Sequence, residues 1–95
     1  MFGLKGTKDR LPVAPIPHYS RIGLTIEVGE RSIEIREKRS LRTEVTILPL
    51  QQIASVRATG ITLKDVEIIM SSGVRHSYMI GRDGAGVARA IQEAI

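Results

Sequence analysis

The sequence predicts a mainly β fold: a strongly bent antiparallel sheet, or partly open barrel, of six or seven strands capped by one C-terminal α-helix. Between residues 21 and 80, apolar and polar residues alternate in short runs, which is the period of half-buried strands. Glycine, proline and serine interrupt these runs at short intervals, as turns do. After Asp83 the apolar residues recur every three or four positions instead, which is the period of a helix.

The length of the chain allows one domain. It has 95 residues, of which 42% are hydrophobic and 25% charged, as in an ordinary globular domain. A chain of this size buries only a little more than ~60% of the surface that it exposes when unfolded. We therefore expect a thin margin of stability, and we expect an exposed apolar edge to favour self-association.

Residues 1–20 are predicted to form an arm outside the folded domain, which spans residues 21–95. Pro12, Pro15 and Pro17 cannot donate to a strand ladder, and neither a period of 2 nor one of 3.6 runs through this segment. Leu11, Val13 and Ile16 are apolar residues with which the arm could dock on the domain.

Three strands in a row are predicted to form a meander. The first runs from Arg21 to Val28 and turns at Gly29-Glu30, a two-residue hairpin whose glycine would adopt a positive φ. The second begins at once, and the third follows a polar turn. The residues expected to point inward are Ile22, Leu24, Ile26 and Val28, then Ile33 and Ile35, then Leu41, Val45 and Ile47, with Arg42, Glu44 and Thr46 outward.

A corner is predicted after the third strand. Pro49 has no N–H group and is expected to end that strand's pairing, and residues 50–53 lead to a fourth strand with Val56 and Ala58 inward. We expect Ile47, Ile53 and Val56 to be buried together at this corner.

The remaining chain is predicted to contain a hairpin and the helix. Residues 61–70 form a strand with an irregularity at Lys64-Asp65, and Ser71-Ser72-Gly73 turns into a strand over residues 74–80. Asp83 is placed to cap a helix of ~12 residues, which is too short to persist without docking on the strands. The residues expected to face inward are Val74, Tyr78 and Ile80 on the strand and Val87, Ala88, Ile91, Ala94 and Ile95 on the helix.

This order of elements, with the phrase Thr46-Ile47-Leu48-Pro49-Leu50-Gln51-Gln52-Ile53-Ala54-Ser55-Val56, resembles the bacterial pleckstrin-homology-like domains. The likeness covers residues 23–95 and implies a bent sheet of seven strands in two layers, with one end plugged by the terminal helix. Two features depart from eukaryotic members. Ile91 takes the place of their helix tryptophan, and Val28-Gly29-Glu30-Arg31 does not match their basic inositol phosphate signature.

The net charge of +4 invites a search for an anionic partner. Basic residues cluster in the arm, at Lys5, Lys8 and Arg10, and around the polar turn predicted between the second and third strands. Several guanidinium groups on one turn could cradle an anion, because each can form paired hydrogen bonds to phosphate. The alternative is a solvated hairpin tip, the more common meaning of a charge run. The candidate anion-binding residues are Arg36, Lys38, Arg39 and Arg42.

Other motifs do not indicate catalysis, a cofactor or a metal. The Gly81–Gly86 stretch lacks the Lys-Ser/Thr of a phosphate loop, so a strand-to-helix turn is expected there. His18 and His76 have no partner at metal-ligand spacing, and we expect His76 to be a partly buried structural residue. No serine lies in a nucleophile-elbow pattern. Aromatic residues make up 3% of the chain, which leaves few platforms for stacking nucleic acid bases.

The function expected from these observations is non-enzymatic protein binding or assembly, with self-association through a strand edge. The alternative is a peripheral membrane or anionic-ligand module that uses the Arg36–Arg42 turn and the basic arm. The chain contains no cysteine, no signal-peptide core and no apolar run long enough to span a membrane, so we expect a cytoplasmic protein. Nucleic acid binding is the weakest of the three interpretations.

Overall fold

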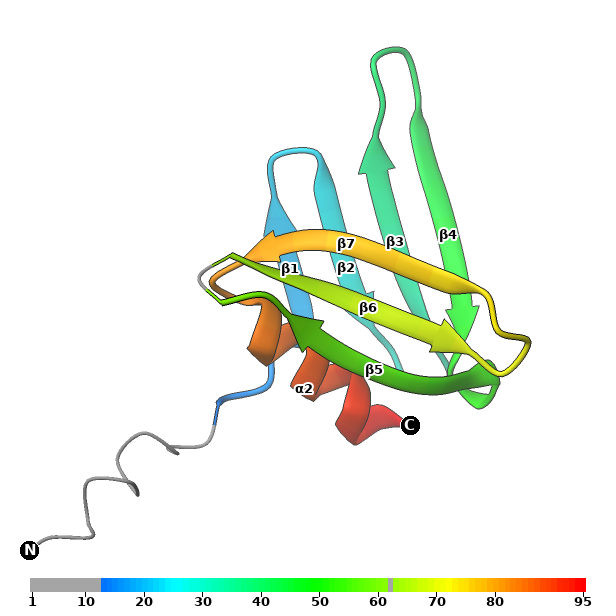
Figure 1. Ribbon diagram of the computed structural model, residues 1–95. Coiled ribbons are helices and arrows are strands. Elements are labelled where there is room, and N and C mark those ends of the chain that lie inside the picture. The colour runs from blue at the N-terminus through cyan, green and yellow to red at the C-terminus, as the bar shows by residue number, and fades with distance from the viewer. Residues whose placement is uncertain (1–12, 62) are drawn as a thin grey trace, which may run out of the picture.

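The computed structural model describes residues 13–61 and 63–95, so the basic residues predicted at Lys5, Lys8 and Arg10 lie outside the described part. Two antiparallel sheets and one C-terminal helix confirm the predicted fold class (Figure 1). The first sheet has the order β1-β2-β3-β4 and the second the order β5-β6-β7. The elements are β1 (His18–Arg21), β2 (Leu24–Val28), β3 (Ser32–Lys38), β4 (Thr43–Pro49), the 3₁₀ helix η1 (Leu50–Gln52), β5 (Ile53–Thr59), β6 (Lys64–Met70), β7 (Arg75–Gly81) and α2 (Gly84–Ala94).

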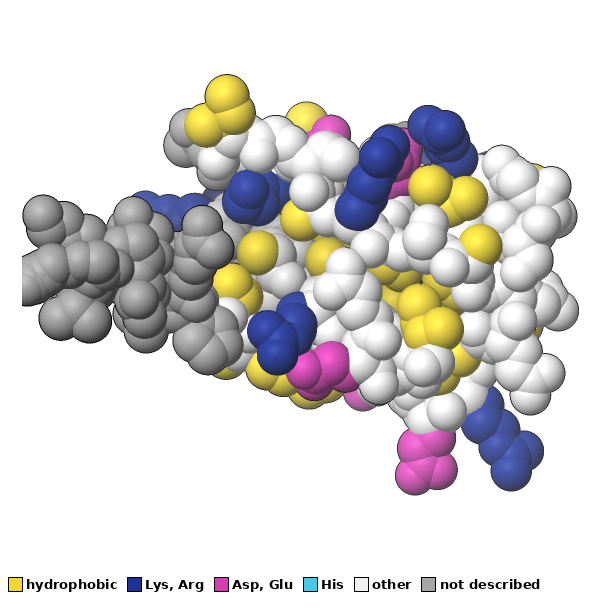
Figure 2. All heavy atoms as spheres, turned by 60° about the horizontal axis from the view of Figure 1, so that its bottom comes forward, with side chains coloured by type: hydrophobic (Ala, Val, Ile, Leu, Met, Phe, Trp, Pro, Cys, Tyr) yellow, Lys and Arg dark blue, Asp and Glu magenta, His cyan; other side chains and the backbone are white. Residues whose placement is uncertain are grey.

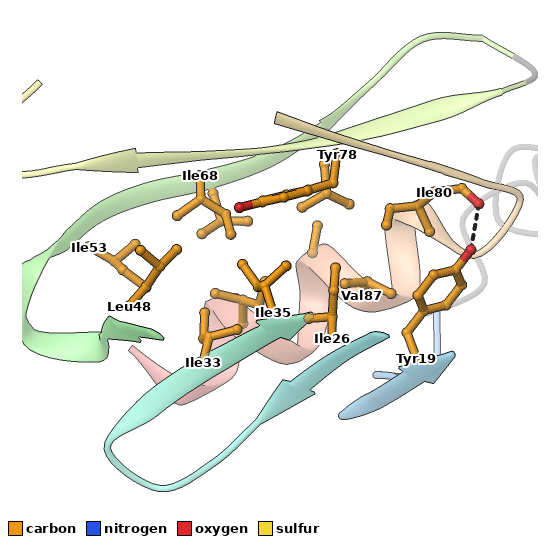
Figure 3. Close-up of a cluster of buried hydrophobic side chains, with 14 of the residues drawn as sticks. Tyr19, Ile26, Ile33, Ile35, Leu48, Ile53, Ile68, Tyr78, Ile80 and Val87 are labelled. Atoms are coloured by element: carbon orange, nitrogen blue, oxygen red, sulfur yellow. Dashed lines mark hydrogen bonds between the residues drawn. The ribbon is translucent and has the colours of Figure 1, made fainter. Parts of the chain in front are cut away.

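The core lies between the two sheets and the helix, and the sheets do not close into a barrel (Figure 3). Isoleucine and valine side chains dominate it, each contributing roughly 1.5–3 kcal/mol when removed from water. Those with at most 2% exposed surface are Ile26, Ile33 and Ile35 from the first sheet, Val66, Ile68 and Ile80 from the second, and Val87 and Ile91 from the helix. The arrangement is consistent with a pleckstrin-homology-like fold, in which Ile91 occupies the inward helix position.

The predicted first strand is in fact two strands. β1 ends at Arg21, and the chain turns at Ile22-Gly23, where Gly23 adopts a φ of +84°. Ile22 is therefore fully exposed at a hairpin turn, and the prediction that it points inward is wrong. β1 also begins at His18, inside the segment assigned to the arm, because three prolines ending at Pro17 do not prevent pairing of the residues that follow.

The second hairpin forms where it was predicted but with a different turn. Gly29 donates its N–H to the Ser32 carbonyl at 2.9 Å, and its φ is not positive. In the β2–β3 register Gly29 lies opposite Ser32, so the turn residues are Glu30 and Arg31 rather than Gly29 and Glu30, and the glycine is not required to adopt the left-handed conformation. Ile33 and Ile35 lie on the inner face, as predicted.

The predicted orientation of the third strand of the meander, β4, is wrong. Leu48 pairs with Ile33 and Thr46 with Ile35, so these residues share the inner face. Leu41, Val45 and Ile47 are 97%, 51% and 60% exposed. Since Ile47 and Leu48 are adjacent, the local pattern allows either face, and the pairing with β3 decides between them because a slip of one residue reverses every side chain.

The corner is confirmed, with one change. β4 continues through Pro49, which pairs with Ser32, and η1 then passes the chain from one sheet to the other. The Leu50 N–H donates to the Arg31 carbonyl at 2.8 Å, which anchors this connection to the first sheet. Ile53 and Val56 are buried as predicted, and Ile47 is not.

The C-terminal elements agree with the predictions, except that the strand predicted over residues 61–70 begins only at Lys64. The pairing of β6 shifts between Lys64 and Asp65, and Gly73 turns the next hairpin with a φ of +94°. Tyr78 and Ile80 are buried, whereas Val74 precedes β7 and is half exposed.

Helix α2 packs on β5 and β6. Asp83 occupies the N-cap position, but its side chain makes no capping hydrogen bond. Val87, Ala88 and Ile91 face the core, while Ile95, after the last helical turn, is half exposed. None of the helices in the described residues is long and apolar enough to cross a membrane.

Candidate interaction surfaces

The predicted anion-binding residues are brought to the β3–β4 hairpin, where acidic side chains engage three of them. The Arg36 guanidinium pairs with the carboxylate of Glu34. Arg39 lies 3.2 Å from Glu44, and Arg42 lies 3.7 Å from the other oxygen of the same carboxylate. A further pair joins Arg39 to Glu37 at 3.6 Å, and Lys38 is an exposed residue at the end of β3.

These exposed ion pairs contribute little to stability, but they neutralise most of the positive charge of the hairpin. A hollow of about 500 Å³ at the tip is lined by Arg39, Ser40, Leu41, Arg42 and Glu44, so a carboxylate faces the space that an anion would enter. The face of the molecule that carries α2 and β5 shows basic side chains at several separate places, two of them close together near the upper edge of Figure 2.

Three turns carry fully exposed aliphatic side chains. Ile22 lies on the β1–β2 turn, Leu41 on the β3–β4 turn and Ile61 on the β5–β6 connection, with exposed fractions of 101%, 97% and 95%. In Figure 1 the β5–β6 connection lies at the left, the β1–β2 turn at the upper left and the β3–β4 turn at the top.

A pocket of about 340 Å³ opens beside two of these turns, where β1 meets the end of β7. The Tyr19 hydroxyl donates to the Ile80 carbonyl at 3.0 Å and so links β1 to β7 (Figure 3). Arg21 donates to the same carbonyl at 3.5 Å. The lining is otherwise mostly apolar and includes Ile22, Leu24, Leu63 and Met79.

The histidines lie apart. His76 is half buried on β7, consistent with the expected structural role, and His18 is exposed on β1, 3.8 Å from the Glu27 carboxylate. Within residues 13–61 and 63–95, no group of three His, Asp or Glu side chains could hold a metal ion. The Gly81–Gly86 stretch is a strand-to-helix turn, with Gly81 at a φ of +90°.

Two side chains have shifted ionisation. On the outer face of the second sheet, hydrogen bonding from Arg57 and the charges of Arg57 and Arg75 hold the pKa of Glu67 below its usual value, although burial opposes this. Burial, aided by the Glu37 carboxylate, raises the pKa of Tyr78 to about 12. Both effects arise from packing and neighbouring charges within the fold.

The two sheets together have four edge strands, which differ in whether another element packs beside them. The β5 edge lies against α2, and the Gln92 amide donates to the Val56 carbonyl at 2.7 Å. β1 is a short edge of four residues. The described residues place no further strand beside β4 or β7, each of which has seven residues.

The backbone groups at the β4 edge can be identified from two hydrogen bonds. The Arg39 N–H donates to the Arg42 carbonyl and the Leu50 N–H to the Arg31 carbonyl, and both pairs continue the β3–β4 register. Because bonded and non-bonded pairs alternate in an antiparallel ladder, the N–H and C=O groups of Thr43, Val45 and Ile47 point away from β3. Their side chains are exposed on the outer face.

The β4 edge is therefore a surface that the sequence did not predict, because Val45 and Ile47 were assigned to the core. The sequence feature that could have indicated an edge strand is Pro49, because sheets tolerate proline mainly on edge strands. In the observed register its nitrogen points to the free edge, so no ladder bond is lost.

Comparison of the chain with protein-family models, with curated proteins and with solved structures finds no match.

Proposed function

We propose that this protein is a non-enzymatic, cytoplasmic interaction module of the bacterial pleckstrin-homology-like kind, whose function is assembly with other proteins, including copies of itself, through a strand edge. The observation that carries the proposal is the β4 edge, where unpaired backbone groups and exposed apolar side chains belong to the same residues.

The physical argument concerns what an open edge does. A row of unpaired N–H and C=O groups is a template for another strand, and proteins that avoid pairing protect such edges with lysine, proline or covering loops. β4 carries valine and isoleucine at Val45 and Ile47, and its one proline lies at the strand end. Addition of a strand to such an edge gives affinity through main-chain hydrogen bonds and specificity through side-chain contacts.

A second candidate is peripheral binding to an anionic membrane surface through the Arg36–Arg42 turn. The observation that favours it is the full exposure of three aliphatic turn residues, Ile22, Leu41 and Ile61, of which Leu41 lies on this turn. Aliphatic side chains flanked by Arg and Lys suit the boundary between headgroups and acyl chains. The acidic partners of Arg36, Arg39 and Arg42 weigh against it.

One experiment separates the two. For assembly, light scattering gives a defined oligomer at micromolar concentration that survives ~0.5 M salt, because apolar and ladder contacts are barely screened. Replacing Arg36, Lys38, Arg39 and Arg42 with glutamine leaves that oligomer intact. A salt-stable monomer that binds phosphatidylserine vesicles, and loses that binding in the glutamine variant, would instead support the membrane function, at ~1 kcal/mol per basic residue.

A further inference from the structure

The two open edges differ in what can approach them. The Met70 N–H donates to the Val74 carbonyl, so the outward backbone groups of β7 belong to Arg75, Ser77 and Met79. This edge faces the β1–β2 and β3–β4 hairpins, which project past it (Figure 1). The β4 edge faces away from its own sheet, and its outward residues include two β-branched apolar side chains.

We propose that β4 pairs antiparallel with β4 of a second copy about a two-fold axis at Thr46, which joins the two first sheets into one continuous sheet. The inference rests on the proposed assembly function and adds the partner, the strand and the register. Such an interface is isologous, since each copy contributes the same strand, and it closes at the dimer.

The register follows from which residues can face each other. With Thr46 on the axis, Val45 of each copy lies opposite Ile47 of the other, and both residues have free N–H and C=O groups to exchange. An axis at Val45 would place Thr43 opposite Ile47, and an axis at Ile47 would place Val45 opposite Pro49, so both registers separate Val45 from Ile47. In the Thr46 register Pro49, which has no N–H to donate, lies opposite Thr43 at the strand end and outside the apolar pairs. The Thr46 axis alone gives two apolar cross-strand pairs, each of the type that stabilises sheets.

The charges on the outer face agree with this register. In β3, Arg36 pairs with Val45 and Glu34 with Ile47. Each row of side chains that crosses the joint sheet then contains four residues in order. Arg36 and Val45 come from one copy, and Ile47 and Glu34 come from the second copy. One positive and one negative residue flank each apolar pair, and no like charges face each other across the new β4–β4 pair.

The shape of the molecule also permits the pairing. The Thr43 end of β4 belongs to a hairpin that projects beyond the second sheet, whereas the Pro49 end lies beside η1 and the β6–β7 turn (Figure 1). A two-fold axis at Thr46 places the projecting end of one copy beside the crowded end of the other. The second sheets of the two copies therefore lie at opposite ends of the strand pair.

The test uses the absence of cysteine from this chain, which makes single-cysteine variants clean probes. In Thr46→Cys the two cysteines face each other in a non-hydrogen-bonded pair, where Cα atoms are about 4.5 Å apart, within the ~4.4–6.8 Å range of disulfides. Mild oxidation should convert most of this variant to a covalent dimer. Thr43→Cys is the control. Residue 43 is more exposed than residue 46, but the two copies of residue 43 lie six positions apart along the strand pair, which is ~20 Å. The Thr43→Cys variant should therefore stay monomeric on a non-reducing gel.

A second pair of variants keeps the test independent of cysteine chemistry. Val45→Lys places a charge in the proposed interface and should weaken dimerisation at least tenfold without unfolding the protein, because residue 45 is half exposed. Met79→Lys, on the other open edge, should leave the dimer intact. An oligomer that Val45→Lys leaves unchanged and that Thr46→Cys fails to cross-link would overturn the β4 interface and leave the assembly function standing. A monomeric wild-type protein would overturn the β4 dimer together with the self-association part of the proposed function.

Discussion

Tyr19 and Tyr78 illustrate how two similar side chains are used differently in this core. Both rings are at least nine-tenths buried. Tyr19 places its hydroxyl against the Ile80 carbonyl and so links the first strand to the last. Tyr78 packs from β7 toward the first sheet (Figure 3), where burial and the nearby Glu37 carboxylate disfavour its ionised form.

The raised pKa of Tyr78 predicts a loss of stability in alkali. The pKa rises from 10.0 when unfolded to about 12 when folded, so the unfolded chain releases the proton first and stability falls between about pH 10 and 12. Two pKa units correspond to roughly 2–3 kcal/mol. Urea unfolding of wild type and Tyr78→Phe should give curves that run in parallel from pH 7 to 9 and then separate, with the phenylalanine variant losing less. Parallel curves to pH 12 would show that Tyr78 titrates normally.

At the scale of the element, β4 and the corner after it show how one strand serves two surfaces. Its inner face supplies Leu48 to the core, and its outer face leaves Val45 and Ile47 exposed. Two residues after Ile47 the chain reaches Pro49, and η1 then turns Ile53 into the space between the sheets. Ile47 and Ile53 lie within seven positions of each other, yet Ile47 is exposed to solvent and Ile53 is buried in the core.

A matched pair of substitutions measures this difference. Ile53→Ala removes a side chain that is 5% exposed and should lower the free energy of unfolding by ~2–5 kcal/mol, as large-to-small core changes do. Ile47→Ala makes the same chemical change at a residue that is 60% exposed and should cost at most about 0.5 kcal/mol in the monomer. Denaturant titration at a protein concentration too low for dimerisation compares the two variants directly. Equal losses in the free energy of unfolding would refute the observed orientation of β4.

At the scale of the whole molecule, the segment before β1 is joined to the helix at the other end of the chain. The Ile16 N–H donates to the Gly86 carbonyl at 2.9 Å, and the Ile16 side chain packs against the core. A Cβ at residue 86 would lie 2.6 Å from Cδ1 of Ile16 and 2.9 Å from the Ala14 carbonyl oxygen. Glycine is required here by close approach of two segments rather than by its φ.

Gly86→Ala tests this contact. Overpacking of this kind costs ~1–3 kcal/mol, which should outweigh the ~1 kcal/mol that alanine gains over glycine in a helix. Ile16→Ala removes the nearest side-chain atoms, so Gly86→Ala should cost less in that background than in wild type. Chemical denaturation of the four proteins of the cycle gives the coupling, and strictly additive losses would show that residues 16 and 86 do not interact.

Much of the fold could be predicted because several signals agreed. The period of two, the corner at Pro49, the irregularity at Lys64-Asp65, the Gly73 turn and the inward stripe of α2 are each properties of a short segment. The predicted anion-binding residues do lie together on one hairpin, but their acidic partners became evident only when β3 and β4 were paired. The β4 edge was missed because its apolar residues look like core residues in a short window.

The sequence by itself determined that this chain forms a small β-rich domain closed by a helix, since alternation, turn residues and helical period are local properties read directly from residue order. The tertiary structure decided which way each strand faces and which edges stay open. A face depends on the pairing partner, because a shift of one residue exchanges core and solvent sides. An edge depends on what the rest of the chain covers. Among residues 13–61 and 63–95 the helix covers β5 while β4 stays open, with Val45 and Ile47 exposed along it.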